Sequence, residues 1–228
     1  MRFGAAGLFL LPTLLVQGAC QQPAVAAGES VRLAPAPQRQ ASEPAGLKVA
    51  IFAGGCYWGV EGVFSHMKGV TSAVSGFHGG TARTADYEVI SVGNTGHAEA
   101  VRVTYDPAVV RYDQLLQVFF SVVADPTTLN RQGPDSGTQY RSALIPMSAE
   151  QRAVAEAYLA QLGKAKVWKA PIVTRVEPHK QFYPGPAYHQ DFMAKNPRHP
   201  YILAWDVAKV DALKRTFPQL YKSAFTKG

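Results

Sequence analysis

The sequence predicts an α+β fold in which helices pack on a single mixed β-sheet, an elaborated two-layer sandwich of the ferredoxin-like kind. Segments with strand periodicity alternate with segments of helical periodicity, and no segment repeats another. Apolar residues make up 47% of the 228 positions and charged residues 17%, so a sizeable core can form. We expect one folded domain over residues 47–205 and a helical extension over residues 206–228, interrupted at Pro218.

Strands are expected where apolar runs are short or alternate with polar residues, as Val101, Val103 and Tyr105 do. The expected strands are residues 47–53, 70–77, 99–105, 142–145 and 172–177. Helices are expected where apolar residues recur at helical spacing, and a capping box of Ser148 and Gln151 marks one helix start. The expected helices lie between Gly55 and Gly69, at residues 112–123, at about 149–162 with Gly163 as the stop, around His189, and at 206–225.

The N-terminal residues have the pattern of a targeting signal. Arg2 precedes an uncharged, mostly apolar run, residues 3–16, that is too short to span a bilayer comfortably. Residues 1–26 are therefore expected to be a signal sequence. Residues 27–46, rich in Ala, Pro and Gln, are expected to form a tether or disordered leader.

Two processing routes remain open for this signal. Cys20 could become the acylated first residue of a lipoprotein, although Gln17 stands where an aliphatic residue is usual. Ordinary cleavage after Ala26 is the alternative. Both routes imply export, and we expect a periplasmic protein that is either soluble or anchored through a lipid on Cys20.

The net charge of +7 does not by itself indicate a nucleic-acid partner. Basic residues are scattered, and their longest run is the pair Lys214 and Arg215, so a solvated basic surface is the better explanation. The two cysteines, Cys20 and Cys56, are too few for a disulfide scaffold. No Cys-x-x-Cys or His-x-x-x-His spacing indicates a metal site.

Cys56 has the sequence surroundings of a reactive thiol. It follows two glycines at the end of a predicted strand and directly precedes a predicted helix. Backbone N–H groups and the helix dipole stabilise an anion there, which would lower the thiol pKa. A buried structural cysteine is the alternative at this point.

Three blocks of sequence occur in order along the domain. They are Gly-Gly-Cys-Tyr-Trp-Gly-Val-Glu at residues 54–61, Gly-Asn-Thr-Gly-His-Ala-Glu at 93–99 and Asp-Ser-Gly-Thr-Gln-Tyr-Arg-Ser at 135–142. Each resembles a block of the peptide methionine-sulfoxide reductases of the A class, and lesser matches extend the resemblance from residue 49 to about residue 200. The resemblance implies a catalytic reductase domain that repairs S-configured methionine sulfoxide in proteins and in the free amino acid after oxidative stress.

The resemblance also implies a role for each matched residue. Cys56 would attack the sulfoxide sulfur as a thiolate, and Glu99, with a pKa raised by burial, would protonate the sulfoxide oxygen. Tyr87 and Tyr140 match tyrosines whose hydroxyls donate hydrogen bonds to that oxygen. Asp135 matches a residue that fixes a water or polar substrate groups, although an aspartate capping a turn would also fit.

Tyr57 and Trp58 would form an apolar cup for the substrate methyl group. Tyr57 stands where the family more often has Phe, and its extra hydroxyl needs a polar partner or an open rim. Attack by Cys56 would leave a sulfenic acid, which a second thiol must reduce. Since no cysteine follows Cys56, we expect a one-cysteine enzyme that is regenerated by thioredoxin or a small dithiol. We also expect a monomer without cofactor or metal.

Two rival functions remain open. Cys56 with His97 as a base would make a thiol hydrolase or acyltransferase, although the resemblance gives His97 no such role. An exported binding domain with an inert Cys56 is the other alternative.

Overall fold

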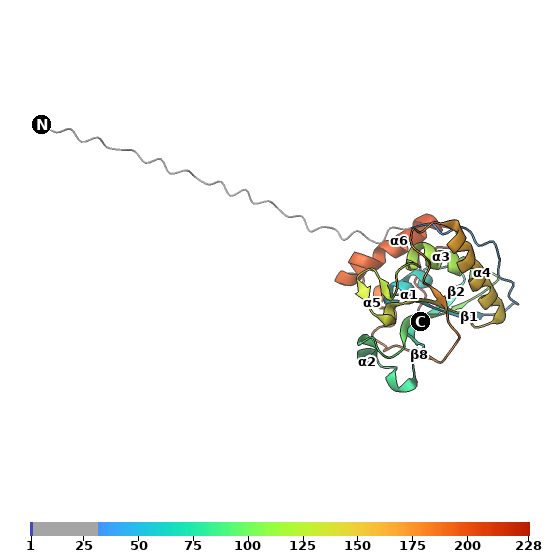
Figure 1. Cartoon of the computed structure of the whole chain (residues 1–228), viewed down its shortest axis with the longest axis horizontal. Coiled ribbons are helices and arrows are strands. Elements are labelled where there is room, and N and C mark those ends of the chain that lie inside the picture. Colours follow the sequence, from blue (N-terminus) through green and yellow to red (C-terminus); the bar gives the residue numbers. More distant parts are fainter. Residues whose placement is uncertain (2–31) are drawn as a thin grey trace.

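The computed structural model describes Met1 and residues 32–228 of the chain, and its central feature is a six-stranded sheet (Figure 1). The strands are β1 (Lys48–Gly54), β2 (Val70–His78), β3 (Ala98–Tyr105), β6 (Ser142–Ile145), β7 (Arg175–Val176) and β8 (Phe182–Pro184). Their order is β7-β6-β1-β3-β2-β8, and all neighbours are antiparallel except the parallel pair β6–β7. The mixed sheet is confirmed, and β6-β1-β3-β2 has the ferredoxin-like order.

The helices are α1 (Tyr57–Ser65), α2 (Tyr87–Ser91), α3 (Tyr112–Val118), α4 (Ala149–Ala165), α5 (Phe192–Lys195) and α6 (Val207–Thr216). Helices α1 to α4 lie in the connections between strands, whereas α5 and α6 follow the last strand; α2 was not predicted. Two π-helical turns, η2 (Phe119–Val123) and η4 (Ile202–Asp206), continue α3 and precede α6. Short elements complete the chain: η1 (Ala82–Thr84), β4 (Arg131–Gln132), β5 (Asp135–Ser136) and η3 (Thr138–Tyr140).

The two faces of β1 show how the sheet divides the core. Ala50 and Phe52 face the large cluster to which α1, α3, α4 and α6 contribute apolar side chains. Ile51 and Ala53 face a second, smaller cluster formed mostly by strand residues. Phe52 lies at the centre of the large cluster, with its ring centroid 4.6 Å from that of Phe64. The helices therefore cover one face of the sheet, as in a two-layer sandwich.

Two predicted helix ends differ from the structure. Gly163 does not stop α4, which continues to Ala165 and ends where Lys166 adopts a left-handed conformation. The predicted break at Pro218 is confirmed because α6 ends at Thr216, but no helix follows it. Residues 217–228 instead contact the end of α1 and the start of β2, and Lys222 N donates to the His66 carbonyl at 2.8 Å. The prediction of helix as far as residue 225 is therefore wrong.

The described part of the predicted tether, residues 32–46, packs on the domain. Ala34 is buried, and its N–H donates to the Ser121 hydroxyl at 3.0 Å. The Ala41 N–H donates to Asp113 at 2.9 Å, and the Tyr158 hydroxyl donates to the Pro35 carbonyl at 2.7 Å. These contacts give an extended segment its own hydrogen-bond partners, so the prediction of a free tether is wrong for this stretch. The predicted signal sequence lies outside the described residues, apart from Met1.

The Pro-rich stretch after β7 contains an element that the sequence did not predict, the edge strand β8. Pro184 is compatible with a strand there because an edge strand needs no further N–H donor on its outer side. The predicted strand 172–177 is reduced to β7, since Val173 and Thr174 donate instead to the Pro126 carbonyl. Within the described part of the chain, no helix has the length and apolar character needed to cross a bilayer.

Two glycines, one on a strand and one on a helix, differ in the space that surrounds them, so substituting each should change the stability with opposite sign. A Cβ at Gly76 on β2 would lie 2.3 Å from the Tyr183 carbonyl oxygen on β8, whereas a Cβ at Gly163 on α4 would meet no atom within 4 Å. We expect Gly76→Ala to lower the free energy of unfolding by about 1–3 kcal/mol. Gly163→Ala should raise it by about 0.5–1 kcal/mol. Urea unfolding measures both, and a Gly76→Ala protein as stable as wild type would contradict the β2–β8 packing.

Candidate active site

Cys56 lies at the turn between β1 and α1, as the sequence predicted. Gly55 has φ +88°, and a Cβ there would lie 2.5 Å from the Gln132 side chain, so glycine is required at this position. Cys56 is the N-cap residue of α1, which begins at Tyr57. Behind the turn, a Cβ at Gly54 would lie 2.7 Å from the Phe119 ring of η2. The thiol is thus held on a turn that is packed from two sides.

Glu99 reaches the same turn from β3. The residue is 4% exposed and pairs with Phe77 on the neighbouring strand β2. Its Oε2 accepts a hydrogen bond from the Tyr57 N–H at 2.9 Å. Burial raises the pKa of Glu99 to about 8, although the Tyr57 hydrogen bond lowers it. At neutral pH Glu99 is therefore mostly a carboxylic acid and can donate a proton.

The Cys56 thiol is buried as well, and this corrects one expectation. Burial raises the thiol pKa well above its usual value, with further increases from the carboxylates of Glu99 and Asp206. The hydrogen bond from the Trp58 N–H lowers it, but by less. The start of α1 does favour an anion, yet desolvation outweighs that effect. The pKa of Cys56 is therefore raised, and the prediction that it is lowered is wrong.

Trp58 provides a fixed aromatic wall beside Cys56. Its ring stacks on Phe192 with 3.7 Å between centroids, and Tyr201 meets it edge-on at 5.6 Å. Its indole N–H donates to His189 Nδ1 at 2.9 Å. These contacts hold the indole in one orientation, as an apolar cup requires.

Tyr57 lies deeper than the sequence predicted. It is 1% exposed, with its ring against Phe77 at 5.8 Å and His189 at 5.4 Å between centroids. Its hydroxyl is buried and has no hydrogen-bond partner among the described residues. The expectation of a polar partner or an open rim is therefore wrong. Tyr57 packs beneath the cup, and its backbone N–H carries the contact to Glu99.

Tyr87 and Tyr140 come from different elements and meet around the same two groups. Burial raises the pKa of both phenols, and the charges of Glu99 and Cys56 add to the shift in each case. Both hydroxyls therefore remain protonated donors. The Tyr87 ring lies 4.3 Å from that of His189, between centroids.

The block at residues 138–141 holds Tyr140 in place. Arg141 pairs with Glu177 through two hydrogen bonds, at 2.8 and 3.1 Å, and donates to the Gly96 carbonyl at 3.2 Å. Gln139 donates to the Ser91 carbonyl at 3.2 Å, which links this block to α2. Residues 138–141, which belong to the third sequence block, thus mainly hold Tyr87 and Tyr140 in position.

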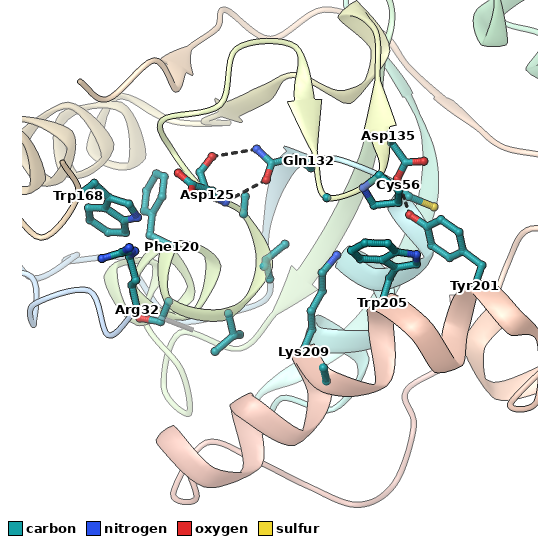
Figure 2. A pocket seen from close by; sticks show the side chains of 17 residues that line it. Arg32, Cys56, Phe120, Asp125, Gln132, Asp135, Trp168, Tyr201, Trp205 and Lys209 are labelled. Atoms are coloured by element: carbon teal, nitrogen blue, oxygen red, sulfur yellow. Dashed lines mark hydrogen bonds between the residues drawn. The ribbon is translucent and has the colours of Figure 1, made fainter. Parts of the chain in front are cut away.

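Asp135 accepts a hydrogen bond from the hydroxyl of Tyr201, a residue that the sequence analysis did not select. Burial raises the pKa of Asp135, while the Tyr201 hydroxyl and the charge of Lys209 lower it. Figure 2 shows this pair beside the Cys56 sulfur. The only signal for Tyr201 was its place at the end of the resemblance, which extends to about residue 200.

Asp206 is a second residue that the sequence did not select. It is fully buried and pairs with Lys209 at 3.3 Å. A Cβ at Gly59 would lie 2.2 Å from its carboxylate, so the third glycine of the Cys56 block is needed for this close approach. Asp206 is one of the charges that raise the pKa of Cys56.

A cavity of about 140 Å³ reaches Cys56 from the side of α6 (Figure 2). We call it the α6 cavity. Lys209 and Trp205 lie along it near Cys56, while Trp168 and Arg32 lie at its other end. Trp58, Glu99, Tyr87 and Tyr140, which we call the sulfoxide site, do not line it.

His97 is placed as a structural residue and not as a base for Cys56. Its Nδ1 accepts from the Gly80 N–H at 3.2 Å, and its Nε2 contacts the Thr81 carbonyl at 3.0 Å. Burial lowers its pKa. Since both ring nitrogens are occupied by the loop before α2, neither is available to take the Cys56 proton.

Comparison with known proteins agrees with these features. Residues 48–220 match the family profile described as peptide methionine sulfoxide reductase. The peptide methionine sulfoxide reductase MsrA 2 of Mesorhizobium japonicum is 57% identical over 176 residues, which cover 77% of this chain and 90% of that protein. The MsrA of Deinococcus radiodurans is 46% identical over 179 residues, covering 78% and 86%.

Two solved structures share the fold. Mxr1 from Saccharomyces cerevisiae in reduced form has a TM-score of 0.58 and 33% identity, over 71% of this chain and 92% of the yeast chain. The methionine sulfoxide reductase A of Corynebacterium diphtheriae has a TM-score of 0.58 and 32% identity, over 75% and 88%.

A cysteine thiol beside a protonated carboxyl group, with His97 directed elsewhere, defines a thiol-dependent oxidoreductase better than a thiol hydrolase. The chain belongs to the peptide methionine sulfoxide reductases, in the A class. It is therefore a peptide-methionine (S)-S-oxide reductase. The predicted family and enzyme class are confirmed.

Proposed function

We propose that this enzyme reduces the S epimer of methionine sulfoxide, in proteins and in free methionine, through attack of Cys56 on the sulfoxide sulfur. The observation that supports this most is the buried Glu99 carboxyl group, protonated at neutral pH and hydrogen-bonded at the start of the helix that Cys56 caps. A thiol attacking sulfur needs such an acid, because the sulfoxide oxygen must gain a proton as its bond to sulfur breaks.

Residues of the site supply every proton that the first half-reaction needs. Glu99 gives its proton to the sulfoxide oxygen, and the thiol proton of Cys56 replaces it. The Cys56 sulfur bonds to the substrate sulfur, and the oxygen ends on Cys56 as a sulfenic acid while methionine leaves. Tyr87 and Tyr140 donate hydrogen bonds to the oxygen as it becomes more basic. Asp135 with Tyr201 orients polar groups of the substrate, and Trp58 contacts its methyl group.

A second, external thiol then returns Cys56 to the reduced form. No cysteine follows Cys56 in the sequence, and Cys20 lies outside the described residues. We propose a thioredoxin-like protein or a small dithiol as the reductant, with no further cofactor. All groups named in the mechanism come from one chain, and we propose that the enzyme acts as a monomer.

The activity is tested by HPLC of the two dabsyl-methionine sulfoxide epimers with dithiothreitol. Wild type and Cys20→Ser should consume the S epimer only, and Cys56→Ser should fall to the background rate because the nucleophile is lost. Hydrolysis of a p-nitrophenyl ester that depends on Cys56, without sulfoxide reduction, would instead favour a thiol hydrolase. If the protein showed neither activity, an exported binding domain would remain as its function.

We also propose that the protein is exported to the periplasm, on the sequence pattern of residues 1–26 alone. Acylation at Cys20 would anchor it to a membrane, whereas cleavage after Ala26 would release it. Intact-mass measurement of membrane and soluble fractions distinguishes the two routes. A full-length, unprocessed chain in the cytoplasm would contradict export.

A further inference from the structure

Two groups of residues surround Cys56. On one side lies the sulfoxide site, with Glu99 and Trp58. On the other lies the α6 cavity, whose walls include Trp205, Lys209 and, at its far end, Trp168. Of the residues to which the proposed sulfoxide chemistry gives a role, only Cys56, Asp135 and Tyr201 line this cavity.

Asp135 and Tyr201 lie where the sulfoxide site and the α6 cavity meet. Both line the α6 cavity, and the Tyr201 hydroxyl donates to the Asp135 carboxylate. The Tyr201 ring also meets Trp58 edge-on at 5.6 Å. Tyr201 therefore contacts the sulfoxide site through Trp58 and also lines the cavity, as the largely buried Cys56 does.

We propose that the α6 cavity is the route by which the reducing thiol reaches the sulfur of oxidised Cys56. The inference rests on the proposed function, in which Glu99 and the two tyrosines hold the sulfoxide oxygen. That oxygen becomes the hydroxyl of the sulfenic acid and so remains on their side of the sulfur. Displacement at sulfur is in line, so the attacking thiol must approach from the side away from the leaving oxygen. The α6 cavity reaches Cys56, and neither Glu99 nor the two tyrosines line it.

The chemistry of this step balances with a dithiol as the co-reactant. One thiolate of the dithiol attacks the Cys56 sulfur, the S–O bond breaks, and the hydroxyl leaves as water with a proton from Glu99. The second thiol then attacks the mixed disulfide, which releases the Cys56 thiol and leaves the dithiol oxidised to its disulfide. Two electrons pass from the dithiol to Cys56.

The size and lining of the cavity fit a thiol head group. Its volume of about 140 Å³ is close to that of cavities that accept a benzene-sized molecule. This suits dithiothreitol or a single exposed cysteine side chain of a thioredoxin-like protein. Trp205 and Trp168 offer aromatic surface to sulfur, and the ammonium group of Lys209 favours the thiolate form.

Ala208 on α6 allows the cavity to be filled without touching the sulfoxide site. It lines the cavity and is exposed, so Ala208→Trp should fold normally. Ala160→Trp is the matched control, since Ala160 is also exposed on a helix, α4, and does not line the cavity. A smaller filler, Ala208→Leu, gives an intermediate point.

The two half-reactions are measured separately in the full chain. Methionine formed by reduced, thiol-free enzyme in a single turnover reports the first. Return of the Cys56 thiol in pre-oxidised enzyme, after mixing with dithiothreitol or with reduced thioredoxin, reports the second. We expect Ala208→Trp to form methionine at the wild-type rate and to be regenerated about tenfold more slowly. Ala208→Leu should lie between, and Ala160→Trp should match wild type.

The outcomes separate the possible explanations. Slower regeneration with both reductants supports one route for thiols from either source, and slower regeneration with dithiothreitol alone supports a route for small thiols. Wild-type regeneration of Ala208→Trp with both reductants would overturn the inference, as would equal slowing of methionine formation. If wild-type enzyme formed no methionine in the single turnover, the proposed function itself would fail.

Discussion

The hydrogen bond from the Tyr57 N–H to the Glu99 carboxyl group joins the helix that carries the nucleophile to the strand that carries the acid. It measures 2.9 Å and is buried. α1 begins immediately after Cys56, so this one contact sets the position of the acid relative to the thiol. Removing the carboxyl group would leave a buried N–H without a partner, at a cost of about 1–3 kcal/mol. The acid thus stabilises the turn on which its own chemical partner lies.

Burial raises the pKa of both the Glu99 carboxyl group and the Cys56 thiol. It raises the pKa of Glu99 to about 8 and that of Cys56 well above its usual value, so both are mostly neutral before substrate enters. An uncharged site suits methionine sulfoxide, which is polar but carries no net charge on its side chain. The site needs no proton from solvent for the first step, because the thiol proton replaces the one that Glu99 gives. Before the reaction the site therefore holds a protonated Glu99 and a neutral Cys56 thiol. The Cys56 thiolate forms only as the reaction proceeds.

The features of the site that depend on short stretches of sequence could be predicted. The strand–glycine–cysteine–helix turn follows from local patterning, and the strand carrying Glu99 follows from alternation. The protonation of Cys56 could not be predicted, because it depends on burial and on Asp206, which lies far along the chain. Likewise, residues 32–46 have the composition of a tether, yet partners such as Ser121 and Tyr158 order them. Side-chain partners of this kind leave no periodicity in the sequence.

The role of Glu99 as the proton donor is measured by the pH dependence of the single-turnover rate in wild type and Glu99→Gln. Glutamine keeps an oxygen for the Tyr57 N–H but cannot supply the proton. The wild-type rate should fall as the pH rises through about 8, where the carboxyl group loses its proton. Glu99→Gln should be slower on the order of 10²-fold and lack this decline. A Glu99→Gln enzyme with the wild-type rate and pH profile would contradict the mechanism.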